Sequence, residues 1–154
     1  MFIICAEMKT NKKHNQIILI QLKATIMSFK AKLKVAGKEY NVLNVSYGLC
    51  QETDATGRPS TVSRGGKIDV TVEGTGATDV FEWMTNSFER KDGSVVFFKR
   101  DSEATLKELK FTEAYLVKHK ERFDATGDNP LTETFTISAR KIEMGSGAFE
   151  NEWV

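Results

Sequence analysis

Residues that could carry nucleophilic catalysis are scarce in this chain. Its 154 residues include two cysteines and two histidines, of which Cys50 and His119 lie in the main part of the sequence. A Cys–His dyad requires both side chains within hydrogen-bonding distance and an oxyanion donor beside them. No pattern indicates such a site, and a lone cysteine after Leu49 is typical of a small core residue. We therefore expect no enzymatic activity and no cofactor.

Three carboxylates, Asp101, Glu103 and Glu108, are a second candidate for acid–base chemistry or metal binding. Basic residues surround them in the sequence: Lys99, Arg100, Lys107 and Lys110. Such mixed charge is typical of a solvated surface. Residues 27–154 also keep only one cysteine and one histidine, too few for an intrachain disulfide or the usual Cys/His zinc site. We expect no metal.

The first 26 residues differ in character from the rest. Twelve of them are Ile, Lys or Asn, which AT-rich non-coding DNA tends to encode, so we expect an upstream mis-start or a disordered leader, with Met27 as the natural start. A signal peptide fits poorly because Gln21 and Lys23 interrupt the apolar run and no small-residue cleavage site follows. A membrane span would need roughly 20 consecutive apolar residues, which the sequence lacks. We expect a leader at residues 1–26 and one domain at residues 27–154.

Net charge excludes one broad class of function. The whole chain carries a formal charge of +1, and the leader holds four lysines and one glutamate, so residues 27–154 carry −2. A weakly acidic domain is not a general binder of nucleic acid, whose phosphates attract basic surfaces. The length suits one domain with an ordinary core, and we find no linker, repeat or low-complexity tract.

Three strands are predicted in the first half of the domain. Residues 28–35 alternate apolar and polar side chains, as in a strand with one solvated face. A tight turn at residues 36–38 leads to a second run, where a phase slip between Val42 and Leu43 indicates a β-bulge. Residues 67–73 form the third strand. Residues 53–66, before it, have no period, and a loop of this length is either functional or a mobile surface loop.

One helix and one hairpin are predicted next. Thr78 can cap a helix over residues 79–85, whose acidic residues favour its positive end and whose apolar face would cover the sheet. Asp92-Gly93 predicts a hairpin turn. The apolar run at residues 95–98 indicates a strand that is buried on both faces or packs against a neighbouring subunit.

Residues 102–123 are ambiguous between helix and strand. Propensity and loosely spaced leucines favour a helix, whereas the spacing of Leu109 with Phe111 and of Tyr115 with Val117 favours a strand with these residues on one side. Periodicity alone does not decide. A turn at residues 127–130 then precedes a strand over residues 131–144 and a final short strand. The fold class expected is mainly β.

Several stretches, in their order along the chain, resemble a known family. They are SFKAKL at residues 28–33, the helix at 79–85, KFTEAYLV at 110–117 and FTISAR at 135–140. The chain resembles the Hcp-like tube proteins of the bacterial type VI secretion system, close to the TssD branch, over residues 27–154. The resemblance implies a small β-barrel of two curved antiparallel sheets with one short flanking α-helix. It also favours strand for residues 107–122.

The resemblance implies a function in assembly. Subunits of this family form six-membered rings that stack into a hollow tube, and a ring and a stack each need a heterologous contact. We expect a homo-hexamer that stacks into tubes, with contractile sheath, spike, baseplate and effector proteins as partners, and with no nucleic acid or membrane insertion. It would assemble in the bacterial cytoplasm and be secreted without a signal peptide.

The resemblance places the stacking contact in residues 53–66, which correspond to a loop that reaches the adjoining ring. Its candidate residues are Arg58, Pro59, Arg64 and Gly65. The arginines would donate charge-assisted hydrogen bonds across the stack; the alternative is that both are solvated.

Val96 and Phe98 are candidates for a lateral contact within the ring, because residues 95–98 could pair edge to edge with a neighbour's strand. For Val95 and Phe97, burial in the subunit's own core is the expected role.

The alternative function is a monomeric β-barrel that binds a peptide or small ligand. Such a module should keep an apolar concavity.

Overall fold

The computed structural model describes residues 29–100 and 102–153. The predicted leader, its boundary at Met27, and Asp101 lie outside these ranges. The described chain forms β1 (Ala31–Val35), β2 (Lys38–Tyr47), β3 (Lys67–Glu73), α2 (Asp79–Thr85), β4 (Lys91–Phe98), β5 (Thr105–Phe123), β6 (Leu131–Met144) and β7 (Gly147–Glu150). None of the described helical residues forms a helix long and apolar enough to cross a membrane.

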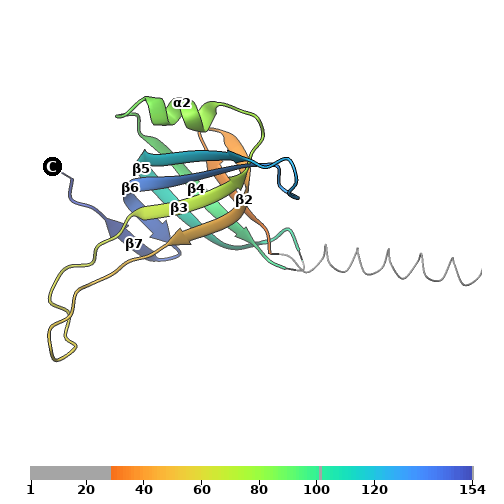
Figure 1. Ribbon diagram of the computed structural model, residues 1–154. Helices are drawn as coiled ribbons and strands as arrows, with labels where there is room; N and C mark the ends of the chain where they lie inside the picture. Colours follow the sequence, from red (N-terminus) through yellow and green to blue (C-terminus); the bar gives the residue numbers. More distant parts are fainter. Residues whose placement is uncertain (1–28, 101, 154) are drawn as a thin grey trace, which may run out of the picture.

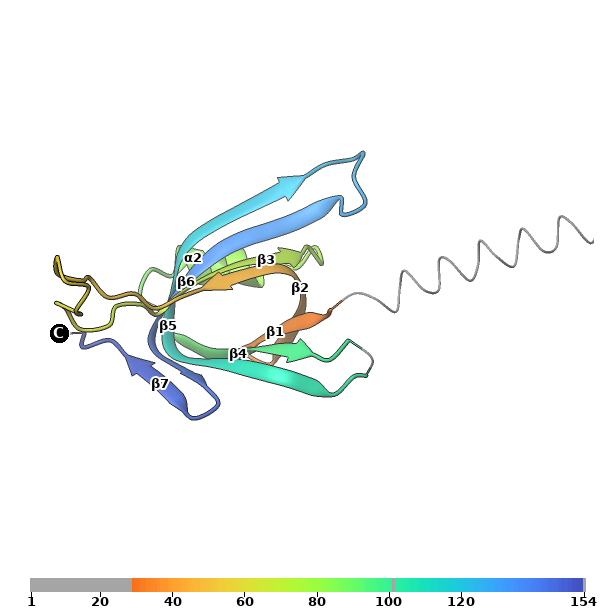
Figure 2. The ribbon, with the colours of Figure 1, turned by 90° about the horizontal axis from the view of Figure 1, so that it is seen from below.

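Six strands close an antiparallel β-barrel. Their order is β3-β2-β1-β4-β5-β6, and β6 pairs back with β3. β7 extends the sheet beside the second half of β6. Figures 1 and 2 show two curved sheets that share the long strands β5 and β6, with α2 along one flank. The expected fold, a small β-barrel with one flanking helix, is confirmed.

The turn and the bulge expected around β2 are both present. Ala36 has a φ of 50° and Gly37 a φ of 77°, which gives the two-residue connection that suits twisted antiparallel strands. The register between β2 and β3 shifts between Val42 and Asn44. The slip in the apolar pattern therefore marks a real bulge.

Residues 105–123 form a strand, β5, as the resemblance implied. Leu109 and Phe111 are buried, but at a bulge the buried positions change phase to Ala114 and Leu116. At this bulge Glu113 has a φ of 49°. The phase change explains why periodicity did not decide between helix and strand. The expectation that Tyr115 and Val117 share a face with Leu109 and Phe111 is therefore wrong.

The face predicted for Tyr115 and Val117 is the outer one. Tyr115 is only half-buried and Val117 is 48 % exposed. The bulge that causes this is stabilised from β4, because the main-chain N–H of Glu113 donates to Asp92 Oδ1 at 2.7 Å. Asp92 therefore supports a bulge instead of a turn.

The predicted Asp92-Gly93 hairpin is wrong. Both residues lie inside β4, which pairs with β1 on one side and β5 on the other. Gly93 serves close packing: a Cβ there would lie 2.4 Å from the Lys34 carbonyl oxygen and 2.5 Å from a Phe111 ring carbon. Because both edges of β4 are paired within the subunit, the expected edge-to-edge pairing of residues 95–98 with a neighbour is also wrong.

The helix α2 begins and ends where the sequence predicts. It lies against β5 and buries Val80 and Trp83, and the Trp83 indole N–H donates to the carbonyl oxygen of Glu89 at 2.9 Å. Thr78 does not cap the helix with its side chain, because its hydroxyl donates to the Glu82 carboxylate at 2.6 Å.

Apolar side chains from all six barrel strands form one core. The largest of them that are fully buried are Phe111, Phe135, Leu33, Ile68, Leu109 and Ile137.

The core also holds a polar pair, since His119 Nε2 lies 3.3 Å from Glu133 Oε2 and the two side chains are 8 % and 3 % exposed. Burial, with the negative charges of Asp79 and Glu133, raises the pKa of Tyr40 to about 12.

Candidate functional site

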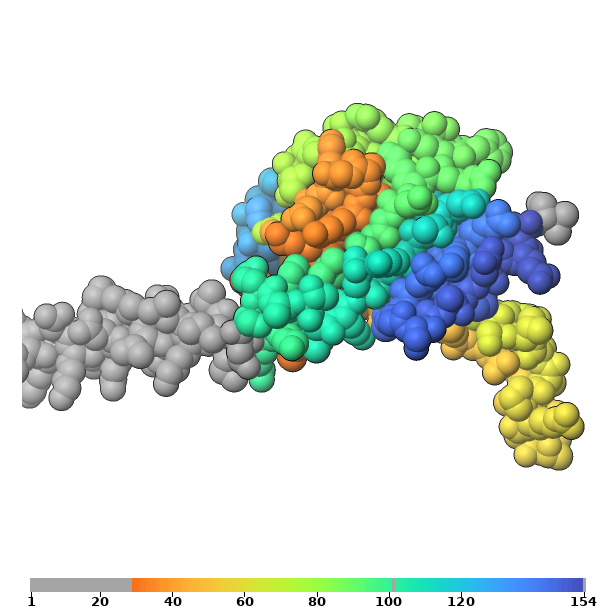
Figure 3. Space-filling model, turned by 180° about the vertical axis from the view of Figure 1, so that it is seen from behind, coloured from red at the N-terminus to blue at the C-terminus, as the bar shows by residue number. Residues whose placement is uncertain are grey.

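Residues 48–66 connect β2 to β3 and project from one end of the barrel as an arm (Figures 1 and 3). Two antiparallel bridges, Cys50 with Arg64 and Thr53 with Pro59, pair its two sides. Main-chain hydrogen bonds run both ways between Cys50 and Arg64, at 2.9 and 2.8 Å. The segment without a sequence period is therefore an extended, two-stranded arm.

The tip of the arm is a turn closed by Asp54. Its Oδ1 accepts hydrogen bonds from the Thr56 hydroxyl at 2.6 Å, the Thr56 main-chain N–H at 2.8 Å and the Arg58 main-chain N–H at 3.1 Å. These bonds, that of the Thr56 hydroxyl above all, lower the pKa of Asp54 because they favour its ionised form. Gly57 supplies the φ of 86° that the turn requires.

The base of the arm is held by the segment that follows β7. The Asn151 side-chain amide donates to the carbonyl oxygens of Gly65 at 3.2 Å and Ala139 at 3.0 Å. Gly66 has a φ of 87°, and a Cβ there would lie 2.4 Å from Asn151 Nδ2. Asn151 and the bare main chain at Gly66 therefore set the direction in which the arm leaves the barrel.

The arm buries almost none of its surface in its own subunit. Every residue from 48 to 64 except Thr61 is exposed, and Val62 is 80 % exposed. An isolated two-stranded ribbon is only marginally stable, and its side chains include no pair of nucleophile and base. The arm is suited to contact with another protein rather than to chemistry.

The four predicted stacking residues lie on different parts of this arm. Arg58 and Pro59 lie at the tip, and the Arg58 guanidinium has no ion pair or hydrogen bond within the described residues. Arg64 lies near the base, where its Nη1 is 3.2 Å from Glu52 Oε1. Gly65 is closely packed, since a Cβ there would meet the Leu49 side chain at 2.3 Å. A contact of these residues with an adjoining ring stays a prediction.

The two predicted lateral residues lie on β4. Val96 is 7 % exposed, so its own subunit already covers most of it, whereas Phe98 is half-buried. Since the main-chain edges of β4 are paired, only side-chain contact with a neighbour is open to them. That contact also stays a prediction.

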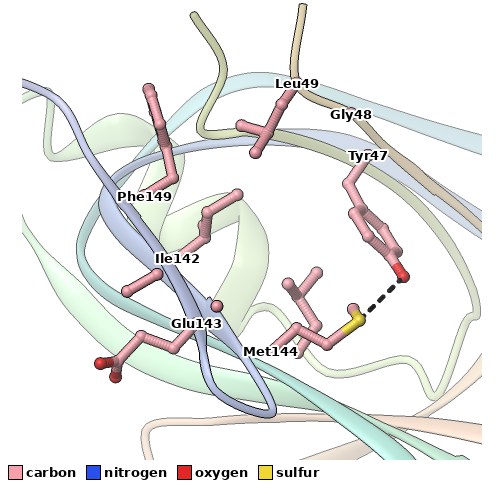
Figure 4. A pocket seen from close by; sticks show the side chains of 10 residues that line it. Tyr47, Gly48, Leu49, Ile142, Glu143, Met144 and Phe149 are labelled. Carbon is pink, nitrogen blue, oxygen red and sulfur yellow. Dashed lines mark hydrogen bonds between the residues drawn. The ribbon is translucent and has the colours of Figure 1, made fainter. Parts of the chain in front are cut away.

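An apolar cavity of about 390 Å³ lies beside the base of the arm (Figure 4). Its wall includes Tyr47 and Leu49 from the end of β2 and the arm, and Ile142, Met144 and Phe149 from the β6–β7 hairpin. The Tyr47 hydroxyl donates to the Met144 sulfur at 3.8 Å. The volume falls within the range of small-molecule sites.

The residues first considered for chemistry are not assembled into a site. Cys50 is exposed on the arm, so its expected role as a core residue is wrong. His119 lies in β5 and contacts Glu133, and Glu103 pairs with Lys30 at 3.5 Å. Within residues 29–100 and 102–153, no group of three His, Cys, Asp or Glu side chains is arranged to hold a metal ion.

The most consequential residue that the sequence analysis missed is Asn151. A single asparagine in a short tail forms no motif. The one local signal is the pair Gly65-Gly66, since adjacent glycines often mark a close approach of main chains.

The comparisons with known proteins agree with this architecture. A family model described as hemolysin coregulated protein Hcp (TssD) matches residues 27–154. The chain belongs to the Hcp (TssD) family. The Hcp1 protein of Flavobacterium johnsoniae, a solved structure, is 72 % identical with a TM-score of 0.76, and the match covers 79 % of this chain and 99 % of that one. A search of curated proteins found no significant match.

More distant Hcp and contractile-system structures share the fold. Hcp1 from Salmonella typhimurium is 15 % identical with a TM-score of 0.65, over 80 % of this chain and 92 % of that one. A chain from the sheath/tube terminator of an extracellular contractile injection system is 19 % identical with a TM-score of 0.51, over 76 % and 94 %. Hcp proteins are secreted structural tube proteins of type VI secretion and are not an enzyme family. The present chain is a tube subunit of this kind, which confirms the resemblance.

Proposed function

We propose that this Hcp-family chain forms hexameric rings that stack into the hollow inner tube of a type VI secretion system. A contractile sheath drives the tube out of the cell, with a spike at its tip and effector proteins in its lumen. The observation that carries the proposal is the arm, because an ordered element that reaches beyond the barrel and buries almost nothing in its own subunit needs a partner. Family membership points to other copies of the chain as that partner.

Stacking requires a heterologous contact that repeats without closing. The arm provides one half of such a contact, and the other half is the surface that the next ring presents. Arg58 and Arg64 donate charge-assisted hydrogen bonds to that surface, while Pro59 and Gly65 shape the arm. Of these two arginines, Arg64 already contacts Glu52, whereas the Arg58 guanidinium has no hydrogen bond or ion pair within the described part of the chain.

Two unpaired strand edges favour closure of a ring. β5 pairs with β4 only as far as Ala114, so residues 115–123 keep one edge that no described strand covers. β2 pairs with β1 only as far as Asn41, so residues 43–47 keep a similar edge. Both edges bound the four-stranded sheet β5-β6-β3-β2, and exposed edges readily pair with another chain. Each subunit can thus offer one edge to each neighbour in a ring.

The remaining contacts follow from the same assembly. Val96 and Phe98 supply side-chain contacts to the neighbour in the ring, and sheath, spike, baseplate and effector proteins are the other partners. The subunit assembles in the bacterial cytoplasm and leaves the cell by type VI secretion without a signal peptide.

Negative-stain electron microscopy with light scattering tests the proposal on the purified full chain. Six-membered rings with an open centre, alone or stacked, are the expected result. A uniform monomer at high protein concentration would contradict it.

A second function is favoured by one observation, the apolar cavity between Tyr47 and Phe149. A monomeric β-barrel that binds a peptide or small ligand needs such a concavity. The monomer outcome above, combined with saturable binding of an apolar dye that Met144→Trp abolishes by filling the cavity, would support this alternative.

A further inference from the structure

Two turns of this chain share the sequence Asp-Ala-Thr-Gly. One is the tip of the arm, residues 54–57, and the other is residues 124–127 at the start of the β5–β6 connection. We call residues 54–59 the arm tip and residues 124–130 the hairpin tip.

The two tips share their turn-closing Asp–Thr hydrogen bonds, although only Gly57 of the two glycines has a positive φ. In the hairpin tip, Asp124 Oδ1 accepts hydrogen bonds from the Thr126 main-chain N–H at 3.1 Å and from its hydroxyl at 2.8 Å. Asp54 and Thr56 make the equivalent bonds in the arm tip, at 2.8 and 2.6 Å. Asp54 and Asp124 therefore each stabilise their own turn.

The tips lie at opposite ends of the barrel (Figure 2). The seven-residue strand β3 gives the length of the barrel between the bases of the arm and the hairpin. The arm leads directly into Lys67 at its start, whereas Glu73 at its end pairs with Thr132, just after the hairpin tip. At about 3.3 Å per residue, this strand separates the two ends by roughly 20 Å.

The residue after the shared sequence differs in charge between the tips. It is Arg58 in the arm tip and Asp128 in the hairpin tip, and both are exposed. Neither side chain has a hydrogen bond or ion pair within the described residues. When copies of the chain stack in one direction along the barrel, the arm end of one copy faces the hairpin end of the next, so these opposite charges lie on surfaces that face each other.

We infer that the partner of the arm tip is the hairpin tip of a subunit in the adjoining ring, with Arg58 bound to the carboxylate of Asp128 in that copy. The inference rests on the proposed function, because it needs rings that stack in one direction. The contact is heterologous and repeats indefinitely along the axis. It gives the stack a polarity, since two arm tips placed together would oppose Arg58 to Arg58, and two hairpin tips would oppose Asp128 to Asp128.

Charge reversal tests this pairing in the full chain. Arg58→Asp and Asp128→Arg each place like charges at the junction, and the double variant restores opposite charges in the reverse order. An exposed pair shifts an equilibrium by about two- to fivefold, so six such contacts at one ring junction multiply to at least about sixtyfold. Each single variant should therefore give rings in place of tubes, and the double variant should give tubes again.

Ring formation by light scattering and tube length by electron microscopy are measured together. Lys110→Glu, which reverses an exposed charge on β5 away from both tips, is the control and should form normal tubes. Tubes of normal length from both single variants, or a double variant that stays as rings, would overturn the pairing while leaving the proposed function intact. Single variants that lose rings as well as tubes would also overturn it, because the residues would then act in folding or ring closure. A wild-type chain without rings would remove the proposed function and this inference together.

Discussion

Among single residues, Arg64 has one contact inside the subunit and one proposed contact outside it. Its Nη1 lies 3.2 Å from Glu52 Oε1, and the two side chains are 63 % and 67 % exposed, so this pair contributes little to stability. Arg64→Glu should keep the unfolding midpoint within about 2 °C of the wild type. It should also shorten the tubes seen by electron microscopy, because the proposed bond of Arg64 to the adjoining ring is lost.

The swap variant Glu52→Arg/Arg64→Glu separates the two roles of Arg64. It restores the ion pair within the arm but leaves a glutamate where the arginine stood. Short tubes in the swap would assign Arg64 to the ring junction. Recovery of normal tubes would show instead that the residue only stiffens its own arm.

Glu113 combines an unusual backbone with two cationic partners. Its carboxylate contacts Arg140, at 3.2 Å, and Arg90, and these contacts, that of Arg140 first, lower its pKa below the ordinary value of 4.5. The lowered pKa adds stability that is present above pH 4.5 and is lost as the pH falls through the lower, folded-state pKa. Glu113→Gln should therefore weaken the acid dependence of the unfolding midpoint below pH 5, measured by thermal melts from pH 3 to 7.

The matched control is Glu152→Gln, which removes a carboxylate that forms no ion pair within the described residues. Acid profiles that coincide for Glu113→Gln and the wild type would rule out a stabilising charge at the bulge. Equal flattening in both variants would attribute the effect to net charge alone.

Among the elements, the arm depends on a contact from the end of the chain. Asn151→Ala leaves the Gly65 and Ala139 carbonyl oxygens without their side-chain donor, at a cost of about 1 to 3 kcal/mol in the free energy of unfolding. Hydrogen exchange should become faster at the arm amides, such as those of Cys50 and Arg64, with little change in β3 and β6. Mass spectrometry of peptides from residues 48–66 measures this directly.

Asn44→Ala is the control for that experiment, because this exposed asparagine makes no side-chain hydrogen bond within the described residues. Arm exchange that stays at the wild-type rate in Asn151→Ala would mean that the arm holds its own shape. Faster exchange throughout the barrel would mean that Asn151 serves the whole fold.

The elements that sequence predicted well are those whose signal is local. Alternation located β3, the helix pattern located α2, and a phase slip located the bulge in β2. The prediction failed at Gly93, where the missing side chain serves contact with Lys34 and Phe111, which are distant in sequence. It was undecided in β5 because the bulge at Glu113 exchanges the inward and outward positions.

The candidate site was less accessible to sequence than the fold. Family resemblance placed Arg58 and Arg64 on a long loop. The bridges that make this loop a two-stranded arm are formed by the main chain, so the pattern of side chains does not predict them. Asp-Ala-Thr-Gly occurs twice in the sequence, but four residues are too few to predict a structural repeat. Its meaning depends on the fold, which places the two copies at opposite ends of the barrel.

At the scale of the whole molecule, we expect residues 27–154 to be sufficient for folding of the barrel and for assembly. The family model matches this range, and the first described strand, β1, begins at Ala31. β1 pairs with β2 and β4 and buries Leu33 completely, so the barrel closes from described residues alone. A chain of residues 27–154 should therefore melt within about 2 °C of the full chain and form the same rings, as measured by thermal unfolding and electron microscopy.

A shorter chain that begins at residue 38 is the control, because it lacks β1 and leaves the barrel open between β2 and β4. It should neither melt cooperatively nor form rings. If residues 27–154 fold like the full chain but stay monomeric, then residues 1–26 take part in assembly and the leader is functional. If they fail to fold, the domain boundary at Met27 is wrong. If the full chain and residues 27–154 form the same rings, every contact needed for assembly lies within residues 27–154.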